Sequence, residues 1–138
     1  LKKKPNKVFK FFLLAAYNRK LNYFSGYIGY NATIGDNLRL PHGLFCIFIS
    51  DYASIGSGCT IYQGVTIGSN DILESKNYGA PIIDDNCYIG AGAKIIGSVK
   101  IGRNVRIGAN CVVTTDVPDN STVVMETARV IMKAKPVD

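Results

Sequence analysis

A branched aliphatic residue returns at every sixth position over much of the second half of the chain. A small or apolar residue follows each of these four positions later, and mostly Gly, Asp, Asn, Arg and Lys fill the places between. The aliphatic series is Ile83, Ile89, Ile95, Ile101, Ile107 and Val113, and the second series is Cys87, Ala93, Val99, Val105 and Cys111. A period of six places successive aliphatics on rotating faces of an α-helix, so these segments are not predicted to be helical.

The same rule holds earlier in the chain. Its members there are Ile28, Ile34, Leu40, Ile55, Ile61 and Ile67, with Ala32, Leu38, Cys59 and Val65 at the second position. Each hexad forms one short strand and one corner, and three hexads, about 18 residues, close a triangular coil around a continuous aliphatic core. The pattern therefore predicts an all-β solenoid over residues 27–117, a parallel β-helix of hexapeptide repeats. The glycine after many of the aliphatics is expected to serve a tight corner.

The repeat is interrupted at two places. The register that should continue six residues after Leu40 resumes only at Ile49, which leaves three extra residues in the segment that contains His42. The spacing from Ile67 to Ile83 is no multiple of six, and the polar segment 69–81 is predicted to protrude as a loop. Interruptions of a solenoid are common places for function.

Two flanking segments complete the predicted domain organisation: a basic helical extension at residues 1–26 and a C-terminal cap and tail at 118–138. The extension alternates apolar and cationic residues, and its most apolar stretch is about ten residues, too short to span a bilayer. A basic amphipathic helix can lie on an anionic membrane surface, and it can equally cap the open end of a solenoid. Both roles stay open from the sequence.

The net charge of +6, from 16 basic and 10 acidic residues, is concentrated at the N-terminus. The seven basic residues that precede Asp36, the first acidic residue, account for it, and the rest of the chain is nearly neutral. A basic groove along the whole domain is not supported, so we expect no nucleic-acid partner. The spacing of the four cysteines matches no metal or redox motif. Cys59, Cys87 and Cys111 fall on inward positions and are expected to be buried free thiols.

Four motifs carry a resemblance to a known family: LPHG at residues 40–43, YQGVTIG at 62–68, GAGAKIIG at 90–97 and VTTDVP at 113–118. With the hexads around them they resemble the O-acetyltransferases of the hexapeptide-repeat superfamily, serine and sugar or capsular enzymes among them, over about residues 27–131. The resemblance implies a left-handed coil, a cytoplasmic homotrimer and acetyl-CoA bound along the seam between two subunits. It implies transfer of the acetyl group to a hydroxyl of a small acceptor or glycan, with no metal required.

The resemblance also assigns roles to individual residues. His42, the only histidine of the chain, matches the general base, and an imidazole with an ordinary pKa near about 6.5 can accept a hydroxyl proton at neutral pH. An incidental surface histidine is the alternative. The cofactor residues implied are Ala91 and Ala109 for the pantetheine arm, Thr114 and Thr115 near the adenylate end, and Arg129 with Lys133 for the CoA phosphates. A solvent-exposed charge is the alternative for Arg129.

The chain departs from the serine acetyltransferase pattern at three places. Tyr27 stands where the family has a carboxylate that orients the base, and residues 78–81 (YGAP) replace a second histidine. Met125-Glu126-Thr127 replaces the usual Gly and Pro. The first two departures favour a sugar or glycan hydroxyl over serine, unless Asp51 or a backbone carbonyl orients His42. The third argues against the expected contacts at the adenylate end of the cofactor.

Two other functions compete with the transferase. A catalytically silent trimeric scaffold or small-molecule binding module would share the fold. A metalloenzyme of the γ-carbonic-anhydrase type needs three histidines at each interface, which two subunits with one histidine each cannot supply.

Overall fold

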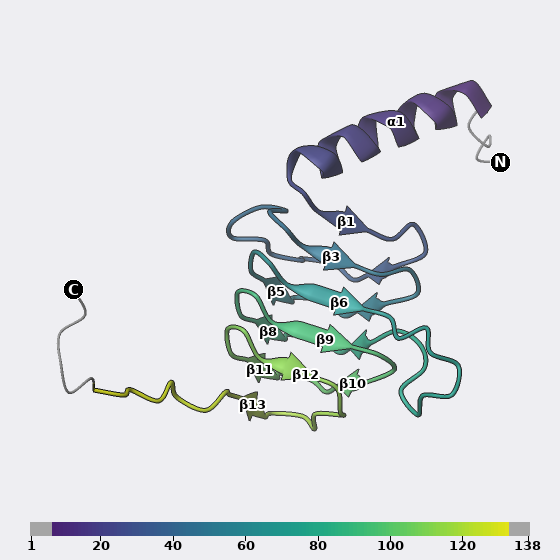
Figure 1. The fold of residues 1–138 in the computed structure, drawn as a ribbon. Coiled ribbons are helices and arrows are strands. Elements are labelled where there is room, and N and C mark those ends of the chain that lie inside the picture. Colours follow the sequence, from purple (N-terminus) through teal and green to yellow (C-terminus); the bar gives the residue numbers. More distant parts are fainter. Residues whose placement is uncertain (1–6, 133–138) are drawn as a thin grey trace.

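The computed structural model describes residues 7–132, which form one helix followed by a stack of short strands (Figure 1). The helix and strands are α1 (Lys7–Tyr23), β1 (Tyr27–Ile28), β2 (Thr33–Ile34), β3 (Phe48–Ile49), β4 (Ser54–Ile55), β5 (Thr60–Ile61), β6 (Thr66–Gly68), β7 (Ile82–Ile83), β8 (Tyr88–Ile89), β9 (Lys94–Ile96), β10 (Lys100–Ile101), β11 (Arg106–Ile107), β12 (Val112–Val113) and β13 (Thr122–Val123).

The strands build three parallel sheets, one on each face of a triangular coil. Face A has the strand order β1-β3-β6-β9-β12, face B has β2-β4-β7-β10, and face C has β5-β8-β11-β13. In Figure 1 the chain runs from left to right along face A at the front and returns behind it while the coil descends, which is a left-handed sense. The predicted left-handed parallel β-helix of hexapeptide repeats is thereby confirmed.

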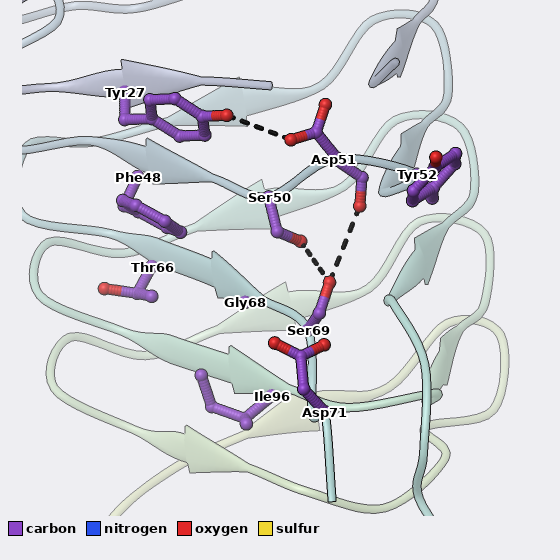
Figure 2. A pocket seen from close by; sticks show the side chains of 10 residues that line it. All are labelled: Tyr27, Phe48, Ser50, Asp51, Tyr52, Thr66, Gly68, Ser69, Asp71 and Ile96. Carbon is purple, nitrogen blue, oxygen red and sulfur yellow. Dashed lines mark hydrogen bonds between the residues drawn. The ribbon is translucent and has the colours of Figure 1, made fainter. Parts of the chain in front are cut away.

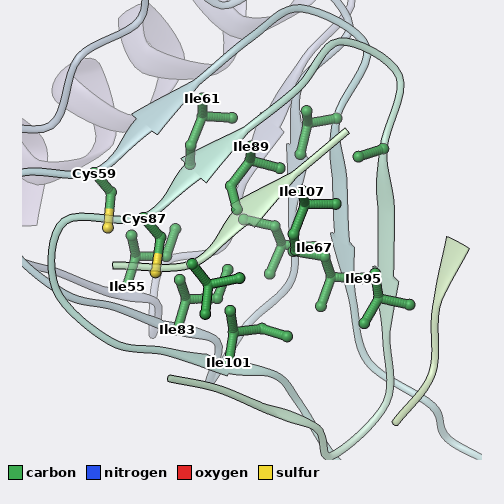
Figure 3. Close-up of a cluster of buried hydrophobic side chains, with 14 of the residues drawn as sticks. Ile55, Cys59, Ile61, Ile67, Ile83, Cys87, Ile89, Ile95, Ile101 and Ile107 are labelled. Carbon is green, nitrogen blue, oxygen red and sulfur yellow. The ribbon is translucent and has the colours of Figure 1, made fainter. Parts of the chain in front are cut away.

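The core is a set of aliphatic columns along the coil axis. Strand register places Ile67 beside Ile95 on face A and Ile61 beside Ile89 on face C, so each isoleucine packs on its counterpart one coil away. Figure 3 shows these side chains pointing into the interior together with Cys59 and Cys87. Cys59, Cys87 and Cys111 are buried free thiols, as predicted. Burying one such aliphatic side chain stabilises the folded state by about 1.5–3 kcal/mol, so the columns supply most of the free energy that stabilises the coil.

The glycines that follow the aliphatics have a different role from the predicted one. The left-handed backbone conformation falls two residues later, for example at Gly92 (φ 70°) and Asn104 (φ 56°). At Gly90 the constraint is space, because an added Cβ would lie 2.7 Å from the backbone nitrogen of Ala109 in the next coil. Glycine at this place therefore permits the close approach of successive coils, and the corner conformation itself is supplied by the later Asn or Gly.

Helix α1 lies across the N-terminal end of the coil (Figure 1). The Tyr17 hydroxyl donates to the carbonyl of Ile28 at 2.9 Å, and the Tyr30 hydroxyl donates to Asn18 Oδ1 at 2.9 Å. These contacts agree with the capping role, while membrane contact stays a prediction. Among residues 7–132, no helix has the length and apolar character needed to cross a bilayer.

The segment 69–81 leaves the coil between β6 and β7. Asn70 and Gly79 form an antiparallel bridge at its base, with two backbone hydrogen bonds of 2.9 Å. At the other end of the chain, β13 pairs with β11 and continues face C beyond residue 117. Residues after β13 have no regular structure and run away from the coil as far as residue 132 (Figure 1).

Candidate active site

His42 lies on the edge of the coil where the chain passes from face C to face A, called here the C–A edge. Its corner follows Arg39, which forms a parallel bridge to Thr60 on face C. The three extra residues widen this corner, which turns at Gly43 (φ 68°) with a hydrogen bond of 2.9 Å from its N–H to the Leu40 carbonyl. The imidazole is exposed, so an acceptor can reach it.

A neutral side chain of the next coil orients the imidazole. His42 Nδ1 lies 2.7 Å from Gln63 Oε1. An amide oxygen only accepts, so in the neutral imidazole this pairing places the proton on Nδ1. Nε2 then keeps its lone pair and faces away from the amide. The ring edge is further held by Tyr62, whose centroid is 5.4 Å away at an interplanar angle of 87°. This is the arrangement that a general base requires.

Gln63 was missed at the sequence level, although a signal for it exists. Its distance from His42 is one coil of three hexads plus the three extra residues of the widened corner. Counting coils instead of searching for a carboxylate would have placed it beside the histidine. Within one chain Asp51 does not contact His42, and the amide of Gln63 lies beside Nδ1 instead.

Asp51 lies on a different edge of the coil, between faces A and B (the A–B edge). The Tyr27 hydroxyl donates to Asp51 Oδ2 at 2.9 Å (Figure 2). The Asn31 N–H donates to Oδ1 of the same carboxylate at 3.1 Å. The Asn31 backbone N–H and the Tyr27 hydroxyl hold the pKa of Asp51 below its usual value. The hydrogen bond to Asp51 also raises the pKa of Tyr27. Tyr27 therefore pairs with Asp51 and not with His42.

A cavity of about 540 Å³ adjoins this pair on face A (Figure 2). Its floor includes Phe48, whose ring stacks on Tyr27 at 5.0 Å, and its rim includes Ser69, whose hydroxyl donates to Ser50 Oγ at 2.9 Å. His42 does not line this cavity. The face A cavity is therefore separate from the candidate base.

Ala91 and Ala109 continue the C–A edge below His42. The Gly92 N–H donates to the Gln63 carbonyl at 2.9 Å, and the Asn110 N–H donates to the Ala91 carbonyl at 2.8 Å. These bonds align Gln63, Ala91 and Ala109 in successive coils. One edge thus carries the base, its partner and a strip of two small residues, along which an extended ligand can lie.

The remaining predicted cofactor residues lie elsewhere in the chain. Thr114 and Thr115 follow β12 on the A–B edge, where Asn77 Nδ2 of the protruding loop donates to the Thr114 carbonyl at 2.6 Å. Arg129 is exposed in the segment after β13, and Lys133 lies outside the described residues. A single chain therefore brings together His42, Ala91 and Ala109, and it does not bring Thr114, Thr115 or Arg129 to them.

The repeat and the fold together define the class of protein. A family model described as bacterial transferase hexapeptide (six repeats) matches residues 80–115. The chain thus carries the repeat of the hexapeptide-repeat transferases and shares their left-handed parallel β-helix. In the part of the chain that the structure describes, no group of His, Cys, Asp and Glu side chains is arranged to hold a metal ion.

Within this superfamily the chain is similar to serine acetyltransferases. It is 42% identical over 103 residues to the serine acetyltransferase of Synechococcus elongatus, covering 75% of this chain and 41% of that protein. It is 37% identical over 125 residues to that of Bacillus licheniformis, covering 90% of this chain and 56% of that protein. The chain thus spans about half the length of these relatives.

Solved structures of serine acetyltransferases share the fold. Isoform 3 from Entamoeba histolytica, in complex with cysteine, superposes with a TM-score of 0.73 at 32% identity, covering 87% of this chain and 44% of that one. The enzyme from Neisseria gonorrhoeae, in complex with serine, superposes with a TM-score of 0.71 at 36% identity, covering 85% and 48% of the two chains. The likeness spans the coil that carries His42.

Proposed function

We propose that this chain is the catalytic domain of an acetyl-CoA-dependent O-acetyltransferase with His42 as general base. The observation that carries the proposal is the 2.7 Å contact between His42 Nδ1 and Gln63 Oε1, which in the neutral imidazole directs the free lone pair of Nε2 to an exposed edge. The similarity to serine acetyltransferases over 75% of the chain supports the same chemistry.

The proposed reaction is a direct transfer. Nε2 of His42 removes the proton of the acceptor hydroxyl while its oxygen attacks the thioester carbonyl carbon of acetyl-CoA. The tetrahedral intermediate collapses when the carbon–sulfur bond breaks, and the imidazolium returns the proton to the sulfur of CoA. The new ester holds the acetyl group, and the base is regenerated without a covalent enzyme intermediate.

The acceptor is a hydroxyl compound, and L-serine is the first candidate because the relatives are named for it. The departures at Tyr27 and Ala80 led to the expectation of a sugar or glycan instead. The comparisons give that preference no support, since the relatives reported above are all named serine acetyltransferases. Both classes of acceptor therefore belong in the first experiment.

The proposed cofactor site needs a second copy of the chain. Ala91 and Ala109 lie on the C–A edge, whereas Thr114 lies on the A–B edge with the protruding loop. An extended acetyl-CoA can contact both sets only where the C–A edge of one copy meets the A–B edge of another. Such a head-to-tail contact closes into a ring, and we propose the homotrimer with three seam sites.

The experiment that tests the function is release of CoA thiol from acetyl-CoA by the purified protein. The acceptor panel holds L-serine, simple hexoses, amino sugars and nucleotide sugars. Release that depends on one acceptor class supports the transferase and names the class. A protein that binds neither acetyl-CoA nor any acceptor and releases no thiol would instead be a scaffold.

A further inference from the structure

Face C carries a polar groove on its outer surface. Its volume is about 340 Å³, and its lining residues are Arg39, Thr60, Asn86, Cys87, Tyr88, Asn104 and Arg106. These residues come from four successive coils. The groove therefore runs along the coil axis on the outer surface of face C. Asn86 and Asn104, in the corners that precede β8 and β11, bound it on the side away from the C–A edge.

Two guanidinium groups, those of Arg39 and Arg106, line this groove. Arg39 is held in place because its Nε donates to Thr60 Oγ1 at 3.0 Å and its Nη2 donates to the Gly58 carbonyl at 3.4 Å. A guanidinium has five N–H donors, so Arg39 keeps free donors after these bonds. Within residues 7–132, no carboxylate lies within ion-pair distance of Arg39 or Arg106, and both side chains are exposed. Oriented, uncompensated guanidinium groups are suited to bind an oxyanion.

A line of aromatic rings joins the groove to the candidate base. The Tyr88 ring of the groove lies 5.2 Å from the Tyr62 ring, and Tyr62 lies 5.4 Å from the imidazole of His42. A hydrogen bond to Tyr62 ties the two phenols together and raises the pKa of Tyr88. A ligand anchored in the groove can therefore extend across Tyr88 and Tyr62 to Nε2 of His42.

We propose that this groove binds the anionic group of a second class of acceptor, a sugar phosphate whose free hydroxyl reaches His42. The proposal rests on the proposed transferase function. Two aromatic rings separate the groove from the base, so the anion and the reacting hydroxyl lie at opposite ends of a sugar-sized molecule. The carboxylate of serine is only a few bonds from its hydroxyl, and serine is too short to occupy both places. Arg106 and Arg39 thus act as specificity-determining residues.

Binding of glucose 1-phosphate to the purified protein, measured by calorimetry without acetyl-CoA, tests the groove independently of turnover. Arg106→Gln removes a charged donor from the groove and should weaken binding about tenfold or more. Arg103→Gln is the matched control, because Arg103 is an exposed arginine of the same coil that does not line the groove. Equal affinity in the wild type and both variants, or no binding at all, would overturn the proposal.

Turnover then assigns the groove to the acceptor. With glucose 1-phosphate, Arg106→Gln should raise KM about tenfold with little change in kcat, while KM for acetyl-CoA and for neutral glucose stays unchanged. Glucuronic acid, which carries a carboxylate, distinguishes a general oxyanion site from a phosphate site. A raised KM for acetyl-CoA would mean that the groove holds a CoA phosphate, and the proposal would be wrong.

The outcomes separate this proposal from the function on which it rests. Serine acetylated by the wild type, with no arginine-dependent binding of glucose 1-phosphate, keeps the transferase and removes the anion groove. Arginine-dependent binding of glucose 1-phosphate with no thiol release for any acceptor keeps the groove and removes the transferase.

Discussion

Replacing Gln63 isolates the contribution of the amide that orients the base. In Gln63→Ala the imidazole remains but loses its 2.7 Å hydrogen bond, and the tautomer with a free Nε2 is no longer enforced. A neutral hydrogen bond contributes about 1 kcal/mol net, which corresponds to about a fivefold loss in kcat. Loss of the base itself in His42→Ala should be much larger, about 10²–10⁴-fold.

The replacement Gln63→Glu gives the same position a charge and predicts a shift in pH dependence. A carboxylate beside Nδ1 favours the imidazolium and raises the pKa of His42. Because the base must be neutral to act, the acid limb of the kcat/KM profile should move to higher pH. An exposed ion pair contributes about 0.2–1 kcal/mol, so the move should be less than about one pH unit.

The assay for both variants is acetyl-CoA-dependent thiol release across pH 5–9, with the acceptor that the panel identifies. Two results would refute the reasoning about the amide. The first is a Gln63→Ala variant as inactive as His42→Ala while still folded, and the second is an acid limb that moves to lower pH in Gln63→Glu.

The other predictions concern the coil. Gly90→Ala should lower the free energy of unfolding by about 1–3 kcal/mol, because its Cβ would meet backbone at 2.7 Å. Gly68→Ala should lower it less in the same urea denaturation, because its Cβ would meet only side-chain atoms, of which Ile96 Cδ1 is nearest at 3.0 Å. Ile89→Ala should cost about 2–5 kcal/mol in the same experiment, and a loss below about 1 kcal/mol would contradict the continuous core. The pKa of Asp51 is lowered on folding, so its stabilisation is present above the unfolded pKa near 3.8 and is lost as pH falls through the folded pKa. The stability difference between wild type and Asp51→Asn should therefore be larger at pH 6 than at pH 3, and a constant difference would contradict this sign.

Much of the fold is encoded in the hexad period alone. The columns that contain Ile61, Ile89 and Ile107 follow from counting, because a period of six returns the aliphatic residue to the interior in each successive coil. The hand of the coil is different, because it depends on the twist of the backbone and not on which residues face inward. The left hand was predicted from the resemblance, and the structure confirms it.

The candidate site was predicted in part. Coil counting puts His42, Ala91 and Ala109 on one edge because the corners repeat with the strands. The orienting partner was expected to be an acid, and the structure places a neutral amide there. The spacing of residues along the chain does not show whether a hydrogen-bonding partner carries a charge. The groove around Arg106 gave no signal either, because outward positions of a hexad carry no periodic pattern.

The most direct test of the central claim is thiol release by His42→Ala compared with wild type, with acetyl-CoA binding measured on both proteins by calorimetry. The account predicts that the variant binds acetyl-CoA as the wild type does and loses turnover by about 10²–10⁴-fold. Turnover retained in His42→Ala, at unchanged acetyl-CoA affinity, would show that His42 is not the base.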